Sequence, residues 1–269
     1  MAYTAIVLEK RNHIATITLN RPRVLNAVDT QMADELADVC WNIGHDEDIR
    51  AAIITGAGDR AFCAGGDLTQ TAGPLDSDSP PPNAVEAFPQ IFEVANILAA
   101  VDCPVITAIN GYALGLGLCL AMVSDIRIAA NNALLGVPDL ARGHLPVSGI
   151  TQHLARLVGR GAALKMLLTA EPINAREAYR IGLVNKVVPP KKLLFEAEAL
   201  AHKIISHPTR VVSAAKAAVN RGLDLPLPRA LELERELALP LVNAPEARKG
   251  ARAFVEKKGS ASGDPIQNG

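Results

Sequence analysis

Two glycine-rich stretches constrain the fold of this chain more than any other feature. Residues 61–68 (AFCAGGDL) and 110–117 (NGYALGLG) each follow an apolar run typical of a strand and precede a predicted helix. Glycine at a strand-to-helix turn lets the backbone approach a ligand closely, with its N–H groups pointing outward. One such turn is a weak signal, but two can each aim one N–H at the same carbonyl oxygen. This arrangement is the geometry of an oxyanion hole, which stabilises negative charge on that oxygen.

The order of the predicted elements indicates an α/β protein. Strand-forming residues predict a hairpin over 5–19, and Asp29 is the expected N-cap of a helix that ends at Gly44. Further elements are expected as strands at 51–56, 105–109, 126–129 and 133–137, and as helices at 84–100 and 117–123. Beyond Pro146 the predicted elements are almost all helices, at 147–158, 160–169, 174–180, 191–205, 208–221, 227–239 and 245–257. Strands that alternate with helices imply helices packed on a mostly parallel sheet.

Composition excludes several classes of protein. The 269 residues, 49% apolar and 20% charged, suit one globular domain or one domain with a helical appendage. A net charge of −1 and 3% aromatic residues argue against a nucleic-acid surface. No apolar run approaches the roughly 18 residues that cross a membrane, and the N-terminus lacks the pattern of a signal peptide. The four cysteines have no CxxC spacing, which predicts reduced, buried thiols in a cytoplasmic protein.

Several motifs in the right order carry a family resemblance. They are residues 21–27 (RPRVLNA), the two glycine-rich stretches, 143–149 (GHLPVSG), 178–188 (AYRIGLVNKVV) and 253–258 (AFVEKK). Together they span about residues 19 to 258, and they resemble the enoyl-CoA hydratase/isomerase family, the crotonase superfamily. The resemblance implies an α/β fold, a crotonase-like spiral of β-β-α turns with a C-terminal helical trimerisation region.

This resemblance predicts a division of the chain. Residues 1–190 are expected to form the α/β core with an acyl-CoA site, residues 191–258 a helical oligomerisation region, and residues 259–269 a disordered tail. An apolar stripe in the first of these helices needs a partner, and comprises Leu193, Leu194, Ala197, Leu200, Ala201 and Ile204. We therefore expect a homotrimer or a dimer of trimers.

The resemblance also assigns catalytic roles. It implies that the N–H groups of Gly66 and Leu116 form the oxyanion hole. Family hydratases use two glutamates, and the matching positions here are Cys119 and Asp139. A thiol in an apolar helix is expected to be inert, whereas Asp139 keeps a carboxylate that is one methylene shorter. His144 is a candidate second acid/base group, with a surface loop histidine as the alternative, and Asp139 itself has the alternative of a solvated turn residue.

Coenzyme A recognition is implied by further positions. No permanently bound cofactor and no metal are expected, since coenzyme A is part of the substrate. The early turn offers Arg21, Arg23 and Val24, and the last helix offers Lys257 with its neighbour Lys258. Backbone contacts to coenzyme A are implied at Ala64, Gly66, Asp67, Leu68 and Leu116.

Three functional readings stay open at this point. The first is an enzyme that isomerises or hydrates the double bond of an enoyl-CoA through an enolate. The second is an acyl-CoA-binding homologue without hydratase activity, and the third is a thioester or β-diketone hydrolase on the same fold. A buried Asp139 without a partner and with a raised pKa would favour an enzyme.

Overall fold

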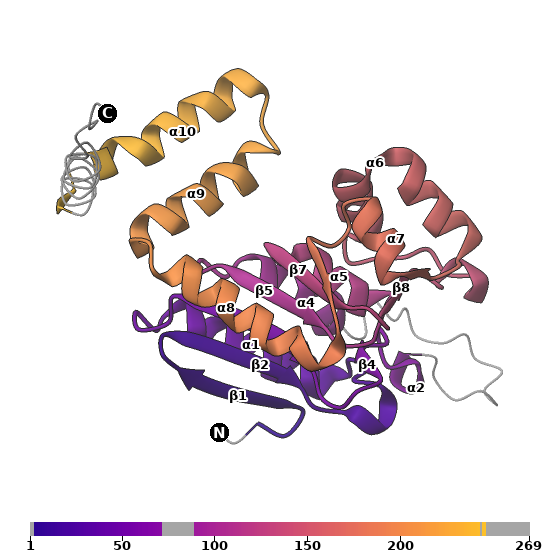
Figure 1. The fold of residues 1–269 in the computed structure, drawn as a ribbon. Coiled ribbons are helices and arrows are strands. Elements are labelled where there is room, and N and C mark those ends of the chain that lie inside the picture. Colours follow the sequence, from indigo (N-terminus) through magenta and orange to yellow (C-terminus); the bar gives the residue numbers. More distant parts are fainter. Residues whose placement is uncertain (1–2, 72–88, 243, 246–269) are drawn as a thin grey trace, which may run out of the picture. The chain divides into compact units, whose positions relative to one another are not determined.

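The computed structural model describes residues 3–71, 89–242 and 244–245 (Figure 1). The chain divides into two compact units, Met1–Ile205 and Ser206–Gly269. The first unit contains every described strand and the two glycine-rich loops. The second unit contains helices only among its described residues.

The larger sheet of the first unit has six strands in the order β1-β2-β3-β5-β7-β10. Their bounds are β1 Ile6–Arg11, β2 Ile14–Leu19, β3 Ala51–Gly56, β5 Val105–Ile109, β7 Ile126–Ala130 and β10 Lys186–Val188. Strands β1 and β2 pair antiparallel as the predicted hairpin, and all other neighbours are parallel. Every residue of β3 and β5 is buried, as expected for central strands covered on both faces.

A second sheet has four short strands in the order β4-β6-β8-β9. Their bounds are β4 Ala61–Cys63, β6 Tyr112–Leu114, β8 Leu134–Gly136 and β9 Ile173–Asn174. The chain alternates between the sheets, since β3, β5 and β7 of the first are followed by β4, β6 and β8 of the second. This alternation confirms the predicted spiral of β-β-α turns.

Local sequence signals mark two of the helix boundaries in the first unit. The bounds of the helices are α1 Thr30–Gly44, α2 Leu68–Thr71, α4 Pro89–Ala99, α5 Leu116–Val123, α6 Ile150–Thr169, α7 Ala175–Arg180 and α8 Leu193–Ile205, with 3₁₀ turns Pro22–Val24, Leu140–Arg142 and Pro190–Lys192. The Asp29 side chain accepts a hydrogen bond from the Met32 N–H at 2.8 Å, which confirms the predicted cap of α1. Gly159, at φ 79° and ψ 158°, breaks α6 at the predicted boundary between two helices.

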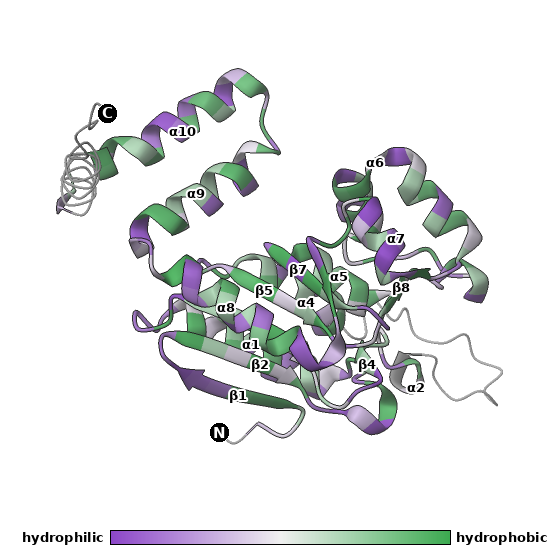
Figure 2. Ribbon diagram, in the orientation of Figure 1, coloured by the Kyte–Doolittle hydropathy of each residue, from purple (hydrophilic) through white to green (hydrophobic). Residues whose placement is uncertain are grey.

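Helix α8 covers the larger sheet of its own chain. Leu193, Ala197 and Ala201 are buried against residues of β3, β5 and β7, and hydropathy colouring shows both apolar and polar residues along α8 (Figure 2). The stripe that predicted a neighbouring subunit therefore has an intramolecular partner. The compact unit ends at Ile205, beyond the expected boundary at residue 190.

The second unit contains α9 (Thr209–Gly222) and α10 (Leu227–Val242), which pack against each other. Of the described residues in these helices, only Leu233 is buried. Large apolar side chains are exposed along both helices and the turn between them, at Val211, Val219, Leu223, Leu225, Leu227, Leu231, Leu239 and Val242. The predicted helix 245–257 and the predicted tail 259–269 lie almost wholly outside the described residues.

Three further features of the described residues bear on the expectations from sequence. All four cysteines are buried and form no disulfide, as predicted. No described helix has the length and apolar character needed to span a membrane. No group of three or more His, Cys, Asp or Glu side chains in the described part of the chain could hold a metal ion.

Candidate active site

The first glycine-rich loop is held by the segment that precedes α1. The Val28 N–H donates to the Gly65 carbonyl, and the Asp67 N–H donates to the Val28 carbonyl, each at 2.8 Å. Gly66 and Val28 thus form a parallel bridge between two loops. In such a bridge the residues that flank Gly66 make the bonds, so the N–H and carbonyl of Gly66 itself point away from Val28. The Gly66 N–H has no hydrogen-bond acceptor among the described residues.

The second glycine-rich loop presents another N–H without an internal acceptor. Gly115 adopts φ +51° and ψ −121°, and its N–H donates to the Gly136 carbonyl at 3.0 Å. Leu116 is the first residue of α5, where backbone N–H groups have no partner within the helix. Within the described residues, the Leu116 N–H makes no hydrogen bond. Its place at the helix N-terminus also favours negative charge nearby.

The two loops are in direct contact. A Cβ atom added to Gly65 would lie 3.7 Å from the backbone nitrogen of Leu116. A Cβ atom added to Gly117 would lie 2.1 Å from the carbonyl oxygen of Cys63, so only glycine fits there. The unpaired N–H groups of Gly66 and Leu116 therefore belong to neighbouring backbone segments, as an oxyanion hole requires. Their convergence on one substrate atom remains a prediction.

Asp139 lies at the same place in the fold. Residues Gly66, Leu116 and Asp139 come shortly after β4, β6 and β8, which are adjacent parallel strands of the second sheet. The carboxyl ends of parallel strands lie at one edge of a sheet, where ligands bind in many α/β proteins. A Cβ atom on Gly115 would lie 3.4 Å from Oδ2 of Asp139, so the carboxylate faces the second glycine loop.

The environment of Asp139 is unusual for a carboxylate. Its Oδ2 atom is buried and has no hydrogen-bond partner within the described part of the chain. Burial raises the pKa of Asp139 above the ordinary carboxyl value, against opposing contributions from its own backbone N–H, Arg142 and His144. A buried polar atom without a partner costs stability and calls for an explanation, and proton transfer is one. The alternative of a solvated turn residue does not fit this burial.

His144 is close to Asp139 without being bonded to its side chain. The His144 backbone N–H donates to the Asp139 carbonyl at 3.1 Å. Its imidazole is exposed and makes no hydrogen bond to the residues described, and it contributes to the field at Asp139. A catalytic role for His144 stays a prediction.

Cys119 stands at the position that the family resemblance matches to the first hydratase glutamate. It is fully buried, and burial raises the pKa of its thiol to about 12. The thiol donates to the Ser148 carbonyl, with Sγ and O 3.0 Å apart. A thiol with such a pKa stays protonated near neutral pH, so it cannot act as a base.

The residues expected to bind coenzyme A differ in exposure. Arg23, Val24 and Leu68 are exposed, whereas Asp67 is buried and Ala64 uses its N–H to bond the Leu25 carbonyl. Lys257, with Lys258, lies outside the described residues. Binding roles at the described positions remain predictions.

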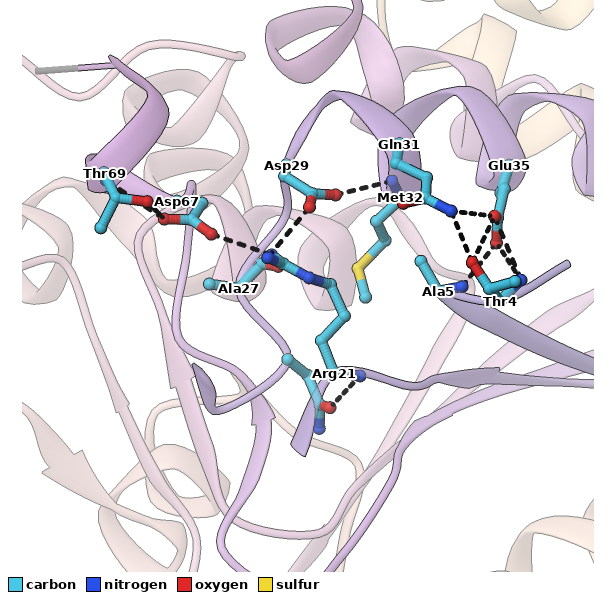
Figure 3. Close-up of polar contacts among 11 residues, drawn as sticks. Thr4, Ala5, Arg21, Ala27, Asp29, Gln31, Met32, Glu35, Asp67 and Thr69 are labelled. Carbon is cyan, nitrogen blue, oxygen red and sulfur yellow. Dashed lines mark hydrogen bonds and ion pairs between the residues drawn. The ribbon is translucent and has the colours of Figure 1, made fainter. Parts of the chain in front are cut away.

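Arg21 has a different environment from the one expected of a phosphate ligand. Its guanidinium lies between two carboxylates, with Nη1 3.0 Å from Asp67 Oδ2 and Nη2 2.9 Å from Asp29 Oδ2 (Figure 3). Nη1 also donates to the Ala27 carbonyl at 2.6 Å. The contact with Asp67 joins segments distant in sequence, so residue spacing offered no signal for it.

Comparisons with known proteins agree with this architecture. The model of the enoyl-CoA hydratase/isomerase family matches residues 9–264. A crotonyl-CoA hydratase of Syntrophomonas wolfei is 40% identical over 96% of this chain and 97% of its own, and a short-chain-enoyl-CoA hydratase of Clostridium acetobutylicum is 39% identical over the same shares. The crystal structure of an enoyl-CoA hydratase from Bacillus anthracis superposes with a TM-score of 0.89 at 34% identity, covering 94% of this chain and 97% of the other. The chain belongs to the enoyl-CoA hydratase/isomerase family.

Proposed function

We propose that the protein moves a proton beside the thioester carbonyl of an enoyl-CoA, with Asp139 as its acid/base group. Coenzyme A enters as part of the substrate. The observation that supports this most is the buried Oδ2 of Asp139, which lies beside Gly115 and has no partner among the described residues. A buried carboxylate oxygen without a hydrogen-bond partner lowers the stability of the fold. Catalytic groups often have this property, because their partner is the substrate.

The thioester oxygen would lie between the N–H groups of Gly66 and Leu116. Removing a proton next to a thioester carbonyl moves negative charge onto that oxygen. Two preorganised donors stabilise this charge, and the loss of one typically raises the barrier by on the order of 3 kcal/mol. The N-terminus of α5 begins at Leu116 and adds its positive end at the same point.

Isomerisation is the reaction that these residues support best. One carboxylate can remove a proton from one carbon of the acyl chain and return it to another, since the group is regenerated in the process. The raised pKa of Asp139 suits this exchange, because it brings the acid and base forms closer to equal population at working pH. The buried thiol of Cys119 adds no second acid/base group.

Hydration is the second candidate, and the names of the relatives favour it. The relatives from Syntrophomonas wolfei and Clostridium acetobutylicum are both named hydratases. Hydration requires a positioned water and a delivered proton, which two groups perform better than one. Arg142 and His144, both in the segment after β8, contribute to the field at Asp139. His144 would be the partner, since an imidazole can exchange a proton in catalysis whereas a guanidinium stays protonated.

The test is a comparison of two substrates with one purified protein. Crotonyl-CoA reports hydration by loss of the conjugated thioester absorbance, and a 3-enoyl-CoA reports isomerisation by gain of it. We expect the wild-type protein to turn over the 3-enoyl-CoA. In Asp139→Asn we expect kcat to fall by about 10²-fold or more. Free thiol released from the thioester would indicate a hydrolase instead. Binding without turnover of any of these substrates would indicate an acyl-CoA-binding protein.

We also propose that the second unit assembles the protein into a trimer or a dimer of trimers. Its described helices expose apolar side chains along most of their length, including Leu223, Leu227 and Leu239. Exposed apolar surface of this extent is typical of an interface. The helix α8 contributes less to this proposal, because its stripe is covered by the sheet. Sedimentation velocity at micromolar protein concentration tests it, and a monomer would contradict it.

A further inference from the structure

Arg21 forms ion pairs with Asp29 and Asp67, which lie next to the two residues of the Val28–Gly66 bridge. Asp29 follows Val28, and Asp67 follows Gly66, and one guanidinium contacts both carboxylates (Figure 3). The third contact of that guanidinium is the Ala27 carbonyl, directly before Val28. Arg21 thus bonds on both sides of the backbone bridge that orients the Gly66 N–H.

The contacts of Arg21 are largely shielded from solvent. The side chains of Arg21, Asp29 and Asp67 are 24%, 14% and 10% exposed. Burial alone would raise the pKa of Asp67, yet hydrogen bonds from Thr69 and Arg21 hold it below the ordinary carboxyl value. An ion pair shielded in this way is stronger and less sensitive to salt than one at the surface.

The backbone of Arg21 is fixed as firmly as its side chain. The Arg21 N–H donates to Oδ1 of Asn26 at 3.0 Å, and the Asn26 N–H donates back to the Arg21 carbonyl at 2.9 Å. Asn26 is fully buried, and its amide also donates to the carbonyls of Ala57 and Ala61. Arg21 therefore extends from a rigid base, so its guanidinium can hold the loop at Asp67 in one place.

We propose that Arg21 is a positioning residue that fixes the Gly66 N–H in the orientation needed for the oxyanion. This inference rests on the proposed function of Gly66. Arg21 acts through Asp67 and Asp29 and does not contact the substrate. Its loss frees the loop at Gly66, and a small misplacement of a catalytic group lowers the rate of the chemical step strongly.

The central variant is Arg21→Gln, which removes the charge and keeps much of the length of the side chain. We expect kcat to fall roughly 10- to 100-fold, below the full effect of deleting an oxyanion donor. Arg21→Lys should recover part of the loss, since an ammonium is a single point charge and cannot bridge two carboxylates in the fork geometry of arginine. Arg180→Gln removes an exposed pair with Glu177 and serves as the matched control, with kcat unchanged.

A second variant separates the ion pair from helix capping. Asp29→Asn removes the charge facing Arg21 but keeps a side chain that caps α1 equally well. We expect a several-fold fall in kcat, and a lower thermal midpoint because Arg21 loses one carboxylate partner, in a protein that still folds with α1 capped. This variant keeps the inference testable where Arg21→Gln does not fold.

Binding measurements distinguish positioning from ligand contact. Free CoA lacks the thioester carbonyl, whereas acetoacetyl-CoA forms an enolate whose ultraviolet absorbance reports stabilisation of the oxyanion. For Arg21→Gln we expect an unchanged Kd for free CoA, a weaker Kd for acetoacetyl-CoA and a smaller enolate signal per bound ligand. A weakened Kd for free CoA would show that Arg21 contacts the ligand, and would overturn the inference.

Three other outcomes distinguish failure of the positioning role from failure of the proposed function. A folded Arg21→Gln with wild-type kcat and enolate signal would refute the positioning role while leaving the proposed function intact. A fall in activity matched by the loss of folded protein alone would assign Arg21 a purely structural role. A wild-type protein that neither turns over enoyl-CoA nor stabilises the enolate would refute the proposed function itself.

Discussion

The thiol of Cys119 donates a hydrogen bond to the backbone carbonyl of Ser148, with Sγ and O 3.0 Å apart. Ser148 has a positive φ of 58°, an uncommon conformation for a residue with a side chain. The bond ties α5 to the loop that follows Asp139. Cys119 therefore has a structural partner, at the position that the resemblance matches to a hydratase glutamate.

Substitutions of Cys119 should separate structure from catalysis. We expect Cys119→Ser, which keeps a donor, and Cys119→Ala, which removes it, to retain kcat within a few-fold. Cys119→Ala should lower the free energy of unfolding by about 1–3 kcal/mol, because the Ser148 carbonyl loses its partner. Steady-state kinetics and urea titrations measure the two effects, and a loss of kcat above tenfold in both variants would contradict the inert role.

Cys119→Glu should add hydration. The surroundings of Cys119 disfavour charge, so an introduced glutamic acid would stay protonated and could donate to substrate water or to the Ser148 carbonyl. We expect the ratio of hydration to isomerisation to rise, measured with the two enoyl-CoA substrates. Cys119→Gln has the same size without the acid and is the control. Equal ratios in both variants would show that residue 119 does not face the substrate.

Asp139→Asn should lower activity while raising stability at neutral pH. The folded-state pKa of Asp139 is raised, so its carboxyl favours folding at low pH and loses that contribution as pH rises through the folded pKa. We therefore expect the variant to exceed the wild type in free energy of unfolding at pH 7. The difference should shrink toward about pH 4, where the unfolded carboxyl is also protonated. Urea titrations at several pH values check this, and a less stable variant at pH 7 would contradict it.

Leu116→Pro tests the second donor without changing the start of α5. Proline is tolerated at the first position of a helix, where its missing N–H has no helical partner. We expect Leu116→Pro to abolish turnover, because it deletes the N–H. Leu116→Ala loses a similar amount of buried side chain and keeps the N–H, so it should retain most of kcat per folded molecule. Equal activity in the two variants would remove Leu116 from the oxyanion hole.

Gly117→Ala should disrupt the contact between the two glycine loops. Its Cβ would lie 2.1 Å from the Cys63 carbonyl oxygen, and backbone atoms cannot move aside cheaply. We expect a loss of roughly 1–3 kcal/mol or more in the free energy of unfolding. Gly161→Ala is the control, since no atom lies within 4 Å of its Cβ and it stands within α6. That variant should be up to about 1 kcal/mol more stable than the wild type, because alanine favours a helix.

If the exposed apolar residues of the second unit form the subunit interface, acidic substitutions among them should weaken assembly. Leu231 and Leu239 of α10 are 55% and 65% exposed, and a buried charge at a subunit interface is costly. We expect Leu231→Glu with Leu239→Glu to shift the protein toward monomer in sedimentation velocity. Leu168→Glu places the same charge at a 69% exposed position of α6 and should leave assembly unchanged. Assembly that survives the double substitution would place the interface elsewhere.

Features governed by local sequence were predictable. The cap at Asp29, the hairpin of β1 and β2 and the break of α6 at Gly159 each follow from residues close together in the chain. The spiral fold was implied by the family resemblance that the motifs carry, whereas the order of the predicted elements alone indicated only an α/β part followed by helices. For the candidate site, the N–H groups of Gly66 and Leu116 have no acceptor among the described residues, and their role as oxyanion donors stays a prediction.

Features that depend on distant partners were not predictable. The three residues of β10 pair with β7, which lies far away in sequence, and the pattern after Pro146 predicted almost only helices. The ion pair of Arg21 with Asp67 joins residues far apart in sequence, and nothing in the early turn indicated it. The burial of Asp139 depends on packing against the second glycine loop, whereas an aspartate after proline usually marks a solvated turn.

The position of Gly66, Leu116 and Asp139 after β4, β6 and β8 has a consequence for the growing chain. Each turn of the spiral contributes one of the proposed functional groups, in the order donor, donor and proton-transfer residue. The ribosome therefore adds both proposed donors before it adds the proposed proton-transfer residue. A fragment that ended after the second turn would also lack the Gly136 carbonyl, which accepts the Gly115 N–H, so the loop beside Leu116 is held in place only once the third turn is made.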